Sequence, residues 1–397
     1  MAYPTTTILS TTLFLVCFHQ SLAINSTTYN IFDLGANPNG QIDSTYSMSK
    51  AWSLACASTI PSTIYVPQGR FMLKHLHFKG PCTNKAITFR LDGTLVAPLY
   101  NDYGAIGNIP HWLLFERADG VSIRGGVLDA RGAALWACKT NGSNNCTTGF
   151  TTLAISNSKN VRISGLTSVN SQMFHIVING CENVMLQGAS VLASGNSPNT
   201  DGIHVQLSRG VTILNSQIGT GDDCISIGPG AADLWIENVG CGPGHGISIG
   251  SLGKDFEEAG VQNVTVKSVT FQNTQNGLRI KTWGRPSKGF VKDVVFQHAI
   301  MSNVQNPILI DQNYCPSNIN CPGQKSGVKI SNVTYQDIQG TSATNVAVKF
   351  DCSEISPCHG IRLENVNLSY QNRSARATCF NAGGTTAGIV EPSSCLF

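Results

Sequence analysis

Residues that could carry acid–base chemistry are concentrated in four short polar segments near the middle of the chain. These segments are Asn199-Thr200-Asp201, Gly221-Asp222-Asp223, Gly244-His245-Gly246 and Arg279-Ile280-Lys281. Each adjoins a short run of alternating apolar residues that is typical of a β-strand, at 203–205, 224–227, 247–249 and 278–281. The steps along the chain are 21 residues from Asp201 to Asp222, then 23 to His245 and 34 to Arg279.

Each segment has a simpler explanation when it is taken alone. Asn-Thr-Asp-Gly and Gly-Asp-Asp are good turn sequences, a histidine between glycines fits a loop, and Arg279 and Lys281 fit solvated charges on a strand. Only 12% of the chain is charged, however, and five charged residues and a histidine recur at similar intervals. We therefore interpret the four segments as one site.

Such a cluster suits the cleavage of a glycosidic bond. That reaction needs one carboxylic acid to protonate the leaving oxygen, and a carboxylate on the other side of the sugar to activate water. Crowded carboxylates repel one another, which raises the proton affinity of at least one of Asp201, Asp222 and Asp223. Arg279 and Lys281 would bind carboxylates of the substrate, arginine through two parallel hydrogen bonds and lysine as a point charge. These residues thus predict an anionic sugar polymer as the substrate.

A short repeat surrounds these segments and would position them. It consists of a small or polar residue, an apolar residue, any residue and a second apolar residue. Nine copies occur: Gly120-Val121-Ser122-Ile123, Asn160-Val161-Arg162-Ile163, Asn183-Val184-Met185-Leu186, Gly210-Val211-Thr212-Ile213, Asp233-Leu234-Trp235-Ile236, Asn263-Val264-Thr265-Val266, Asp293-Val294-Val295-Phe296, Gly327-Val328-Lys329-Ile330 and Gly360-Ile361-Arg362-Leu363. Their first apolar residues are separated by 40, 23, 27, 23, 30, 30, 34 and 33 residues.

Repeats of this length indicate a solenoid. Each copy alternates like a strand and is too short to bury a core alone, whereas stacked copies share one. A β-propeller needs blades of ~40–50 residues, longer than the 23-residue steps seen here. The predicted fold class is therefore all-β, a single-domain parallel β-helix (a solenoid) over residues 24–397. Equivalent strands of such a stack lie about 4.8 Å apart, so the four polar segments would meet on one ridge.

The N-terminus and the cysteines indicate export. Residues 1–23 are predicted to be a signal peptide, with an apolar stretch at 8–18 and Ser21-Leu22-Ala23 before the cleavage point. Closely spaced cysteines predict six disulfides and leave Cys181 as a buried free thiol. The predicted pairs are Cys56/Cys82, Cys138/Cys146, Cys224/Cys241, Cys315/Cys321, Cys352/Cys358 and Cys379/Cys395.

Seven Asn-x-Ser/Thr sequons agree with a secreted, extracellular glycoprotein. They begin at Asn25, Asn141, Asn145, Asn263, Asn332, Asn367 and Asn372. The net charge of +3 is too small to predict nucleic-acid binding, and the chain has no Lys/Arg-rich run. No segment after the signal peptide approaches the ~20 apolar residues of a membrane span. We expect a monomer with neither nucleic acid nor membrane as a partner.

At the four polar segments the sequence resembles the polygalacturonases of glycoside hydrolase family 28, and most closely the plant members. The resemblance rests on 197–204, 220–228, 241–253 and 278–283, which read SPNTDGIH, TGDDCISIG, CGPGHGISIGSLG and LRIKTW. It extends to NPILIDQNYC at 306–315 and to Ala51-Trp52, and it runs from about Phe32 to Cys395.

The resemblance implies a right-handed parallel β-helix in the cell wall that hydrolyses α-1,4-linked galacturonic acid in pectin with inversion. It implies that Asp222 is the general acid and that Asp201 and Asp223 activate water. His245 is similar to a histidine that assists catalysis by holding the protonation and orientation of the acid.

The resemblance also implies how the substrate is held. Arg279 and Lys281 correspond to the residues that grip a substrate carboxylate, and Tyr314 resembles a tyrosine of the binding cleft. No metal and no other cofactor are expected.

Alternatives stay open at this point. A pectate lyase would share the fold and the substrate but would eliminate with the help of calcium, which clustered aspartates can bind. A catalytically silent pectin-binding protein would be expected to have lost one of the three aspartates. A relative that acts on rhamnogalacturonan or xylogalacturonan is a third alternative, although Arg279 and Lys281 favour a galacturonate carboxylate. Endo attack is the working hypothesis over exo attack, which depends on loops that close the cleft.

Overall fold

The apolar residues of the sequence repeat stack directly on one another along the molecule. In parallel pairing, Val161 lies opposite Val184, and Val184 lies opposite Val211. The series continues, coil after coil, to Ile361. All of these side chains are buried in one continuous apolar core. The predicted parallel β-helix is therefore confirmed.

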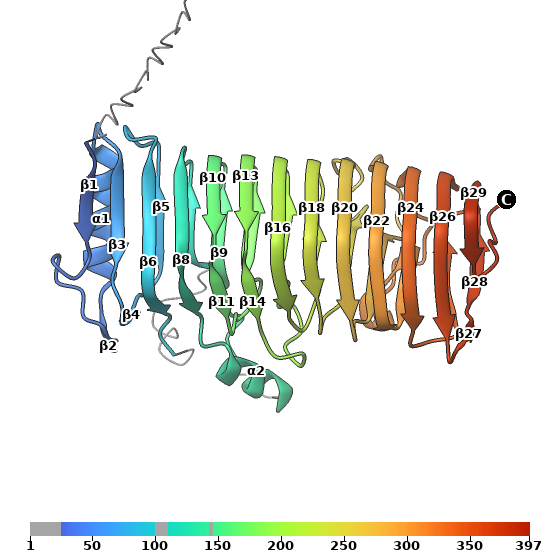
Figure 1. Cartoon of the computed structure of the whole chain (residues 1–397), viewed down its shortest axis with the longest axis horizontal. Coiled ribbons are helices and arrows are strands. Elements are labelled where there is room, and N and C mark those ends of the chain that lie inside the picture. Colours follow the sequence, from blue (N-terminus) through green and yellow to red (C-terminus); the bar gives the residue numbers. More distant parts are fainter. Residues whose placement is uncertain (1–24, 100–109, 143–145) are drawn as a thin grey trace, which may run out of the picture.

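The structure is a computed structural model that describes residues 25–99, 110–142 and 146–397. The predicted signal peptide, residues 1–23, and the sequon asparagine at 145 lie outside the described residues. The strands stand side by side from the N-terminal to the C-terminal end of an elongated molecule (Figure 1). The coils wind in a right-handed sense, as crossover connections between parallel strands do.

Within the described residues the strands form two long sheets. The larger, sheet A, contains β1 (Thr27–Asn30), β2 (Asn39–Asp43), β3 (Ser62–Val66), β4 (Arg70–Met72), β6 (Ile87–Val96), β8 (Val121–Asp129), β10 (Lys159–Ser164), β11 (Thr167–Val169), β13 (Glu182–Gln187), β14 (Ser190–Leu192), β16 (Arg209–Gly219), β18 (Ala232–Cys241), β20 (Val261–Gln272), β22 (Phe290–Val304), β24 (Lys329–Ser342), β26 (Cys358–Tyr370), β27 (Arg373–Ser374) and β29 (Ala382–Glu391). Sheet B contains β5 (Leu76–Lys79), β7 (His111–Glu116), β9 (Thr151–Ser156), β12 (Ile176–Asn179), β15 (Ile203–Gln206), β17 (Ile225–Ile227), β19 (Ile247–Leu252), β21 (Asn276–Trp283), β23 (Asn306–Tyr314), β25 (Val346–Asp351) and β28 (Arg376–Phe380). Among the described pairings, only β26 with β27 is antiparallel.

One copy of the predicted repeat was placed wrongly. The partner of Val294 in β24 is Val333, and Val333 in turn lies opposite Ile361. The segment Gly327-Val328-Lys329-Ile330 lies five residues earlier, where the chain enters the strand. Val328 is nevertheless buried, so the apolar pattern of this segment reflects burial but not the position in the repeat.

The small or polar residue that opens each copy of the repeat, with Asn332 in place of Gly327, is a corner of the coil. Its backbone has a positive φ, a left-handed conformation that Gly, Asn and Asp adopt most easily. One column of such corners precedes the strands of sheet A and consists of Gly120, Asn160, Asn183, Gly210, Asp233, Asn263, Asp293, Asn332 and Gly360. A second column bends the same sheet at Gly125, Gly165, Gly188, Asn215, Asn238, Ser268, His298, Asp337, Asn365 and Gly388.

Side chains at these corners also bond from one coil to the next. The amide Nδ2 of Asn183 donates to Oδ1 of Asn160 at 2.7 Å, and that of Asn263 donates to Oδ1 of Asp233 at 2.6 Å. The corner residues therefore set the turn of each coil and add a polar ladder on its surface.

Among the residues that the structure describes, three helices lie outside the strands. Helix α1 (Thr45–Ala57) covers the N-terminal end of the stack (Figure 1). Its Trp52 packs against Phe78, Phe89 and Phe115 with ring centroids 5.4–5.9 Å apart. Helix α2 (Ala133–Thr140) projects from the side of the stack, and η2 (Pro316–Asn318) is a single short turn. Among the described residues, no helix has the length and apolar composition needed to cross a membrane.

All six predicted disulfides are present, and Cys181 is a buried free thiol as predicted. Burial raises the pKa of the Cys181 thiol. Its Sγ lies 3.3 Å from the carbonyl oxygen of Ile155. This cysteine therefore behaves as a small core residue.

The corner at Asn183 gives a test of the left-handed column. Asn183→Gly and Asn183→Val both remove the amide ladder, but only valine is strained at the positive φ. We expect the valine variant to be less stable than the glycine variant by about 1–2 kcal/mol. Thermal midpoints measured at one scan rate check this, and equal midpoints for the two variants would contradict the role of backbone conformation.

Candidate active site

The four polar segments lie beside four consecutive strands of sheet B. Ile203 of β15 lies opposite Ile225 of β17, Ile225 opposite Ile247 of β19, and Ile247 opposite Leu278 of β21. These apolar residues point into the core and are fully buried. Residues that alternate with them, such as Arg279, therefore lie on the outer face, and Asp223 of the preceding turn bonds to Arg279 there. The ridge predicted from the spacing is present.

The observed register of the ridge differs in one respect from the register predicted from the residue spacing. Asp201, Asp223 and His245 each precede the first residue of their strand by two positions, so these three are equivalent on successive coils. Asp222 lies one residue earlier, in the turn. The predicted step from Asp201 to Asp222 thus falls one residue short of a full coil.

Asp223 is a buried carboxylate with two cationic partners. Its Oδ1 accepts from Nη2 of Arg279 at 2.7 Å and from the hydroxyl of Ser248 at 2.9 Å, and its Oδ2 accepts from Nζ of Lys281 at 2.8 Å. The side chain of Asp223 is 1% exposed, against 9% for Arg279 and 8% for Lys281. Burial alone would raise the pKa of Asp223, but Lys281 and Arg279 outweigh it and lower the pKa to about 2. Asp223 is therefore ionised.

Asp201 is also buried but has the opposite electrostatic environment. Burial raises its pKa well above the ordinary value, and the negative charges of Asp223 and Asp222 raise it further. A hydrogen bond with Ser226 and the charge of Lys281 act against this but do not cancel it. Two equivalent carboxyls on neighbouring coils thus have pKa values that are shifted in opposite directions.

Asp222 and His245 form a pair at the more exposed side of the cluster. Nδ1 of His245 lies 3.0 Å from Oδ1 of Asp222, and the backbone N–H of His245 donates to the Asp222 carbonyl at 2.7 Å. The backbone N–H groups of Asn199 and Asp223 donate to the two oxygens of the same carboxyl, at 3.1 and 2.8 Å. The side chains of Asp222 and His245 are 18% and 34% exposed. A ligand from solvent can therefore reach this pair.

The residues expected to grip a substrate lie beside the acids. Arg279 and Lys281 project outward from β21 and are both bonded to Asp223, as described above. Nζ of Lys281 also lies 5.2 Å from the ring centre of Tyr314 on β23. That ring makes an edge contact with Trp283, with centroids 5.4 Å apart. The structure thus brings all seven predicted site residues to one region.

Three further polar residues were not recognised from the sequence. Ser226 and Ser248 occupy the outward position of β17 and β19, opposite one another, and His204 is the matching residue of β15. Nδ1 of His204 lies 2.7 Å from the hydroxyl of Ser226, and burial lowers the pKa of this histidine. The signal for the serines was the twice-repeated Ile-Ser-Ile, in which a serine stands alone between two core residues.

A metal ion is a poor fit for the acidic cluster. Ligand atoms of Asp222, Asp223 and His245 lie within 4.8 Å of one another, as a cation site requires. Both oxygens of Asp223, however, already accept from Arg279 or Lys281. A divalent cation would have to displace two positive groups from this carboxylate, which favours the ion pairs over calcium.

Comparisons with known proteins agree with this geometry. The family model described as glycosyl hydrolases family 28 matches residues 56–390. A polygalacturonase from Prunus persica is 61% identical over 387 residues, which is 98% of either chain. An exopolygalacturonase from Platanus acerifolia is 41% identical over 93% of this chain and 98% of its own.

A solved structure shares the fold. The endo-xylogalacturonan hydrolase of Aspergillus tubingensis superposes with a TM-score of 0.79 over 92% of this chain and 99% of its own, at 23% identity. The family match covers all four polar segments, and the relatives align over nearly the whole chain. The chain therefore belongs to glycosyl hydrolase family 28.

Proposed function

We propose that this protein is a polygalacturonase that hydrolyses α-1,4-galacturonosyl linkages of pectin with inversion of configuration. The observation that carries the proposal is the meeting of three carboxyls at one place, where Arg279 and Lys281 hold Asp223 ionised beside the solvent-accessible Asp222–His245 pair. An inverting glycosidase needs a proton donor and a separate carboxylate that activates water. The activity of the relatives supports the same assignment.

In the proposed reaction, Asp222 donates a proton to the glycosidic oxygen while the bond from that oxygen to the anomeric carbon breaks. Water attacks the anomeric carbon from the opposite face and loses its proton to Asp223. Asp201 orients this water through its carboxyl group. Afterwards Asp222 is ionised and Asp223 is protonated, and exchange with solvent restores both. His245 holds the carboxyl of Asp222 in position through Nδ1.

The cations explain how a carboxylate with so low a pKa can act as a base. A general base is more effective when its pKa lies near the working pH, and Asp223 is held near 2 by Lys281 and Arg279. A substrate carboxylate competes for these same two groups. When they turn to the substrate, Asp223 loses part of its stabilisation and becomes more basic. Substrate binding thereby prepares the base.

The proposed mode of attack is endo. The outward column that contains Ser226 and Ser248 continues on both sides, from His77 of β5 to Thr378 of β28. The acid cluster lies in the middle of this row. Sheet B therefore extends to both sides of the cleavage point, as attack at an internal linkage requires, although Ala154 and Val177 of this row are themselves buried.

The proposed location is outside the cell, in the wall. Six disulfides favour an oxidising compartment. The six sequon asparagines in the described residues are all exposed: Asn25, Asn141, Asn263, Asn332, Asn367 and Asn372. The proposed partner is the pectin polymer, which the protein would bind as a monomer. We propose no role for a metal, a nucleic acid or a membrane.

The test of the activity is an analysis of products from de-esterified polygalacturonate at about pH 5, with a chelator present. We expect mixed oligomers early in the reaction and no ultraviolet absorbance. Asp222→Asn should lower the rate by about 10²–10⁴-fold while retaining binding, whereas Asp33→Asn, at an exposed position, should have no effect. Unsaturated products would indicate a lyase, and galacturonate monomer as the sole product would indicate an exo-enzyme. Binding of polygalacturonate without any product would indicate a catalytically silent protein.

The pH dependence tests the role of Lys281. Lys281→Met removes the larger of the two cationic contributions that lower the pKa of Asp223. The acid limb of the kcat/KM profile should then move to higher pH, from near the value of about 2 towards the ordinary 3.8. We also expect kcat/KM at the optimum to fall by about 10–100-fold, as one charge-assisted contact is lost. Lys281→Arg should restore the position of the acid limb, and a limb that stays in place in Lys281→Met would contradict the proposal.

The opposite pKa shifts predict opposite effects on stability. A carboxyl whose pKa is raised on folding stabilises the fold below its unfolded pKa, and this contribution is lost as the pH rises through the folded value. Buried Asp201 therefore lowers the stability of the fold at about pH 7. Asp201→Asn should raise the thermal midpoint at about pH 7 but not at about pH 3. Asp223→Asn should lower the midpoint at pH 7 by the equivalent of about 3–5 kcal/mol, because Arg279 and Lys281 lose their buried partner.

Both asparagine variants should lose hydrolysis, so activity alone does not separate them. Calorimetry at the two pH values does. If Asp201→Asn were destabilised at about pH 7 to the same extent as Asp223→Asn, the assignment of different protonation states to the two carboxyls would be wrong.

A further inference from the structure

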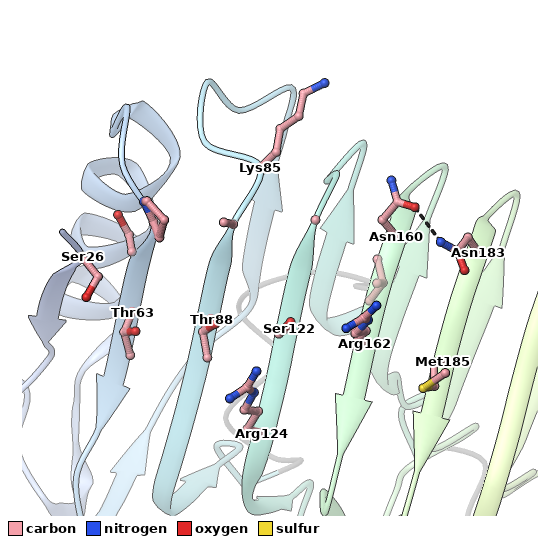
Figure 2. A pocket seen from close by; sticks show the side chains of 15 residues that line it. Ser26, Thr63, Lys85, Thr88, Ser122, Arg124, Asn160, Arg162, Asn183 and Met185 are labelled. Atoms are coloured by element: carbon pink, nitrogen blue, oxygen red, sulfur yellow. Dashed lines mark hydrogen bonds between the residues drawn. The ribbon is translucent and has the colours of Figure 1, made fainter. Parts of the chain in front are cut away.

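A second polar groove lies on the other sheet of the β-helix, away from the acid cluster. It has a volume of about 520 Å³ and runs over β3, β6, β8, β10 and β13 of sheet A. Figure 2 shows Arg124 and Arg162 side by side on neighbouring strands, with Lys85 above them on the loop that leads into β6. None of the seven site residues lines this groove.

The lining of the groove is cationic. Lys85, Arg124 and Arg162 contribute to it, and its lining includes no aspartate or glutamate. In the described part of the chain, neither Arg124 nor Arg162 has an ion-pair partner, and both are exposed. Lys85 pairs only with Asp119 at 3.4 Å, and the side chains are 73% and 37% exposed. Two unpaired guanidinium groups beside each other repel, which favours an anionic ligand between them.

The strand register determines how these groups are spaced. Arg162 lies opposite Ser122, and Arg124 is two residues further along the same strand as Ser122. Strand spacing and rise per residue place the two arginine Cα atoms about 8 Å apart. Guanidinium groups at this spacing can each take a carboxylate in a two-pronged contact.

A row of hydroxyl groups leads up to the arginines. Thr63 lies opposite Thr88, and Thr88 lies opposite Ser122. Among the described residues, none of these three hydroxyls has a hydrogen-bond partner, so all three can bond to sugar hydroxyls. The row follows the long axis of the molecule, and the groove crosses five strands, a length of about 19 Å. That length suits several units of a polymer better than one small anion.

We propose that this groove is a second binding site for the polygalacturonate chain, separate from the active site. Charge complementarity selects an acidic ligand, and the hydroxyl row selects a carbohydrate. The lining contains no aromatic side chain, which disfavours a single-stranded nucleic acid because such sites stack bases on aromatic rings. The proposal depends on the proposed substrate but not on the proposed roles of the aspartates.

The site would act by raising the local concentration of polymer. Because the groove is on sheet A and the acid cluster is beside sheet B, one short oligomer cannot occupy both. A long chain, or a network of chains, can bind the groove while another segment is cleaved. The groove therefore contributes to the affinity for polymer but not to the turnover of short oligomers.

The test uses the double variant Arg124→Gln/Arg162→Gln in the full chain. A matched control removes two exposed cations elsewhere, as Lys329→Gln/Arg373→Gln; neither has an ion-pair partner among the described residues. Binding is measured by retardation in native gels that contain polygalacturonate, with Asp222→Asn added to each protein to prevent cleavage. We expect about tenfold weaker retardation for the arginine pair, and little change for the control.

Kinetics give the second measurement. The arginine variant without Asp222→Asn should have a raised KM for long polygalacturonate and an unchanged kcat/KM for a short galacturonate oligomer. Equal retardation of both double variants would overturn the proposal, as would a parallel loss of oligomer hydrolysis. If dextran sulfate showed the same difference between variants as polygalacturonate, the groove would be a general polyanion site and the proposal would fail. A missing activity in the wild type would instead count against the proposed function, since retardation is measured without cleavage.

Discussion

The hydrogen-bonded ladder between coils is the constraint on which the rest of the structure depends. Each coil must return to the same strand position about 4.8 Å further on, so residues 22 or 31 positions apart in the sequence become neighbours, as from Ile203 to Ile225 and from Ile247 to Leu278. The coil can close only if its corners take a left-handed backbone, which explains the columns of Gly, Asn and Asp. Residues between the corners alternate between core and surface. Any outward side chain is therefore fixed in relation to those on the coils above and below it.

This geometry lets a short stretch of sheet B hold several charges in a small volume. Asp223 is buried with two cations, and the removal of this carboxylate would leave both buried cations without their partner. Asp201 lies one coil away and cannot share those partners to the same extent, so burial keeps its proton in place. The fold thus creates two protonation states from two chemically identical groups. It does so at a cost in stability, which is common where a site is built for chemistry.

Much of the fold and of the site could be predicted from the sequence, because stacked coils require apolar residues to recur at regular intervals. The repeat predicted the fold class and the meeting of the four polar segments on one ridge. The closely spaced cysteines predicted the six disulfides. The copy at Val328 was wrong since a longer loop before β24 carries a similar pattern, and only strand pairing identifies Val333. The ion pairs of Asp223 could not be predicted, because they depend on the direction of side chains across two coils. Spacing shows which residues are neighbours, but it does not show which of them bond.

The double use of the two cations links specificity to catalysis in the proposed mechanism. In the unbound protein, Arg279 and Lys281 neutralise Asp223 and keep it unprotonated. A neutral sugar at the same place offers no charge to draw these groups away, so Asp223 would stay a weak base. A galacturonate unit carries a carboxylate that competes for both. Because the same contact that recognises the acidic sugar also releases the base, a substrate without the carboxylate would lose rate as well as affinity. Discrimination of this kind acts on the transition state, where it is most effective.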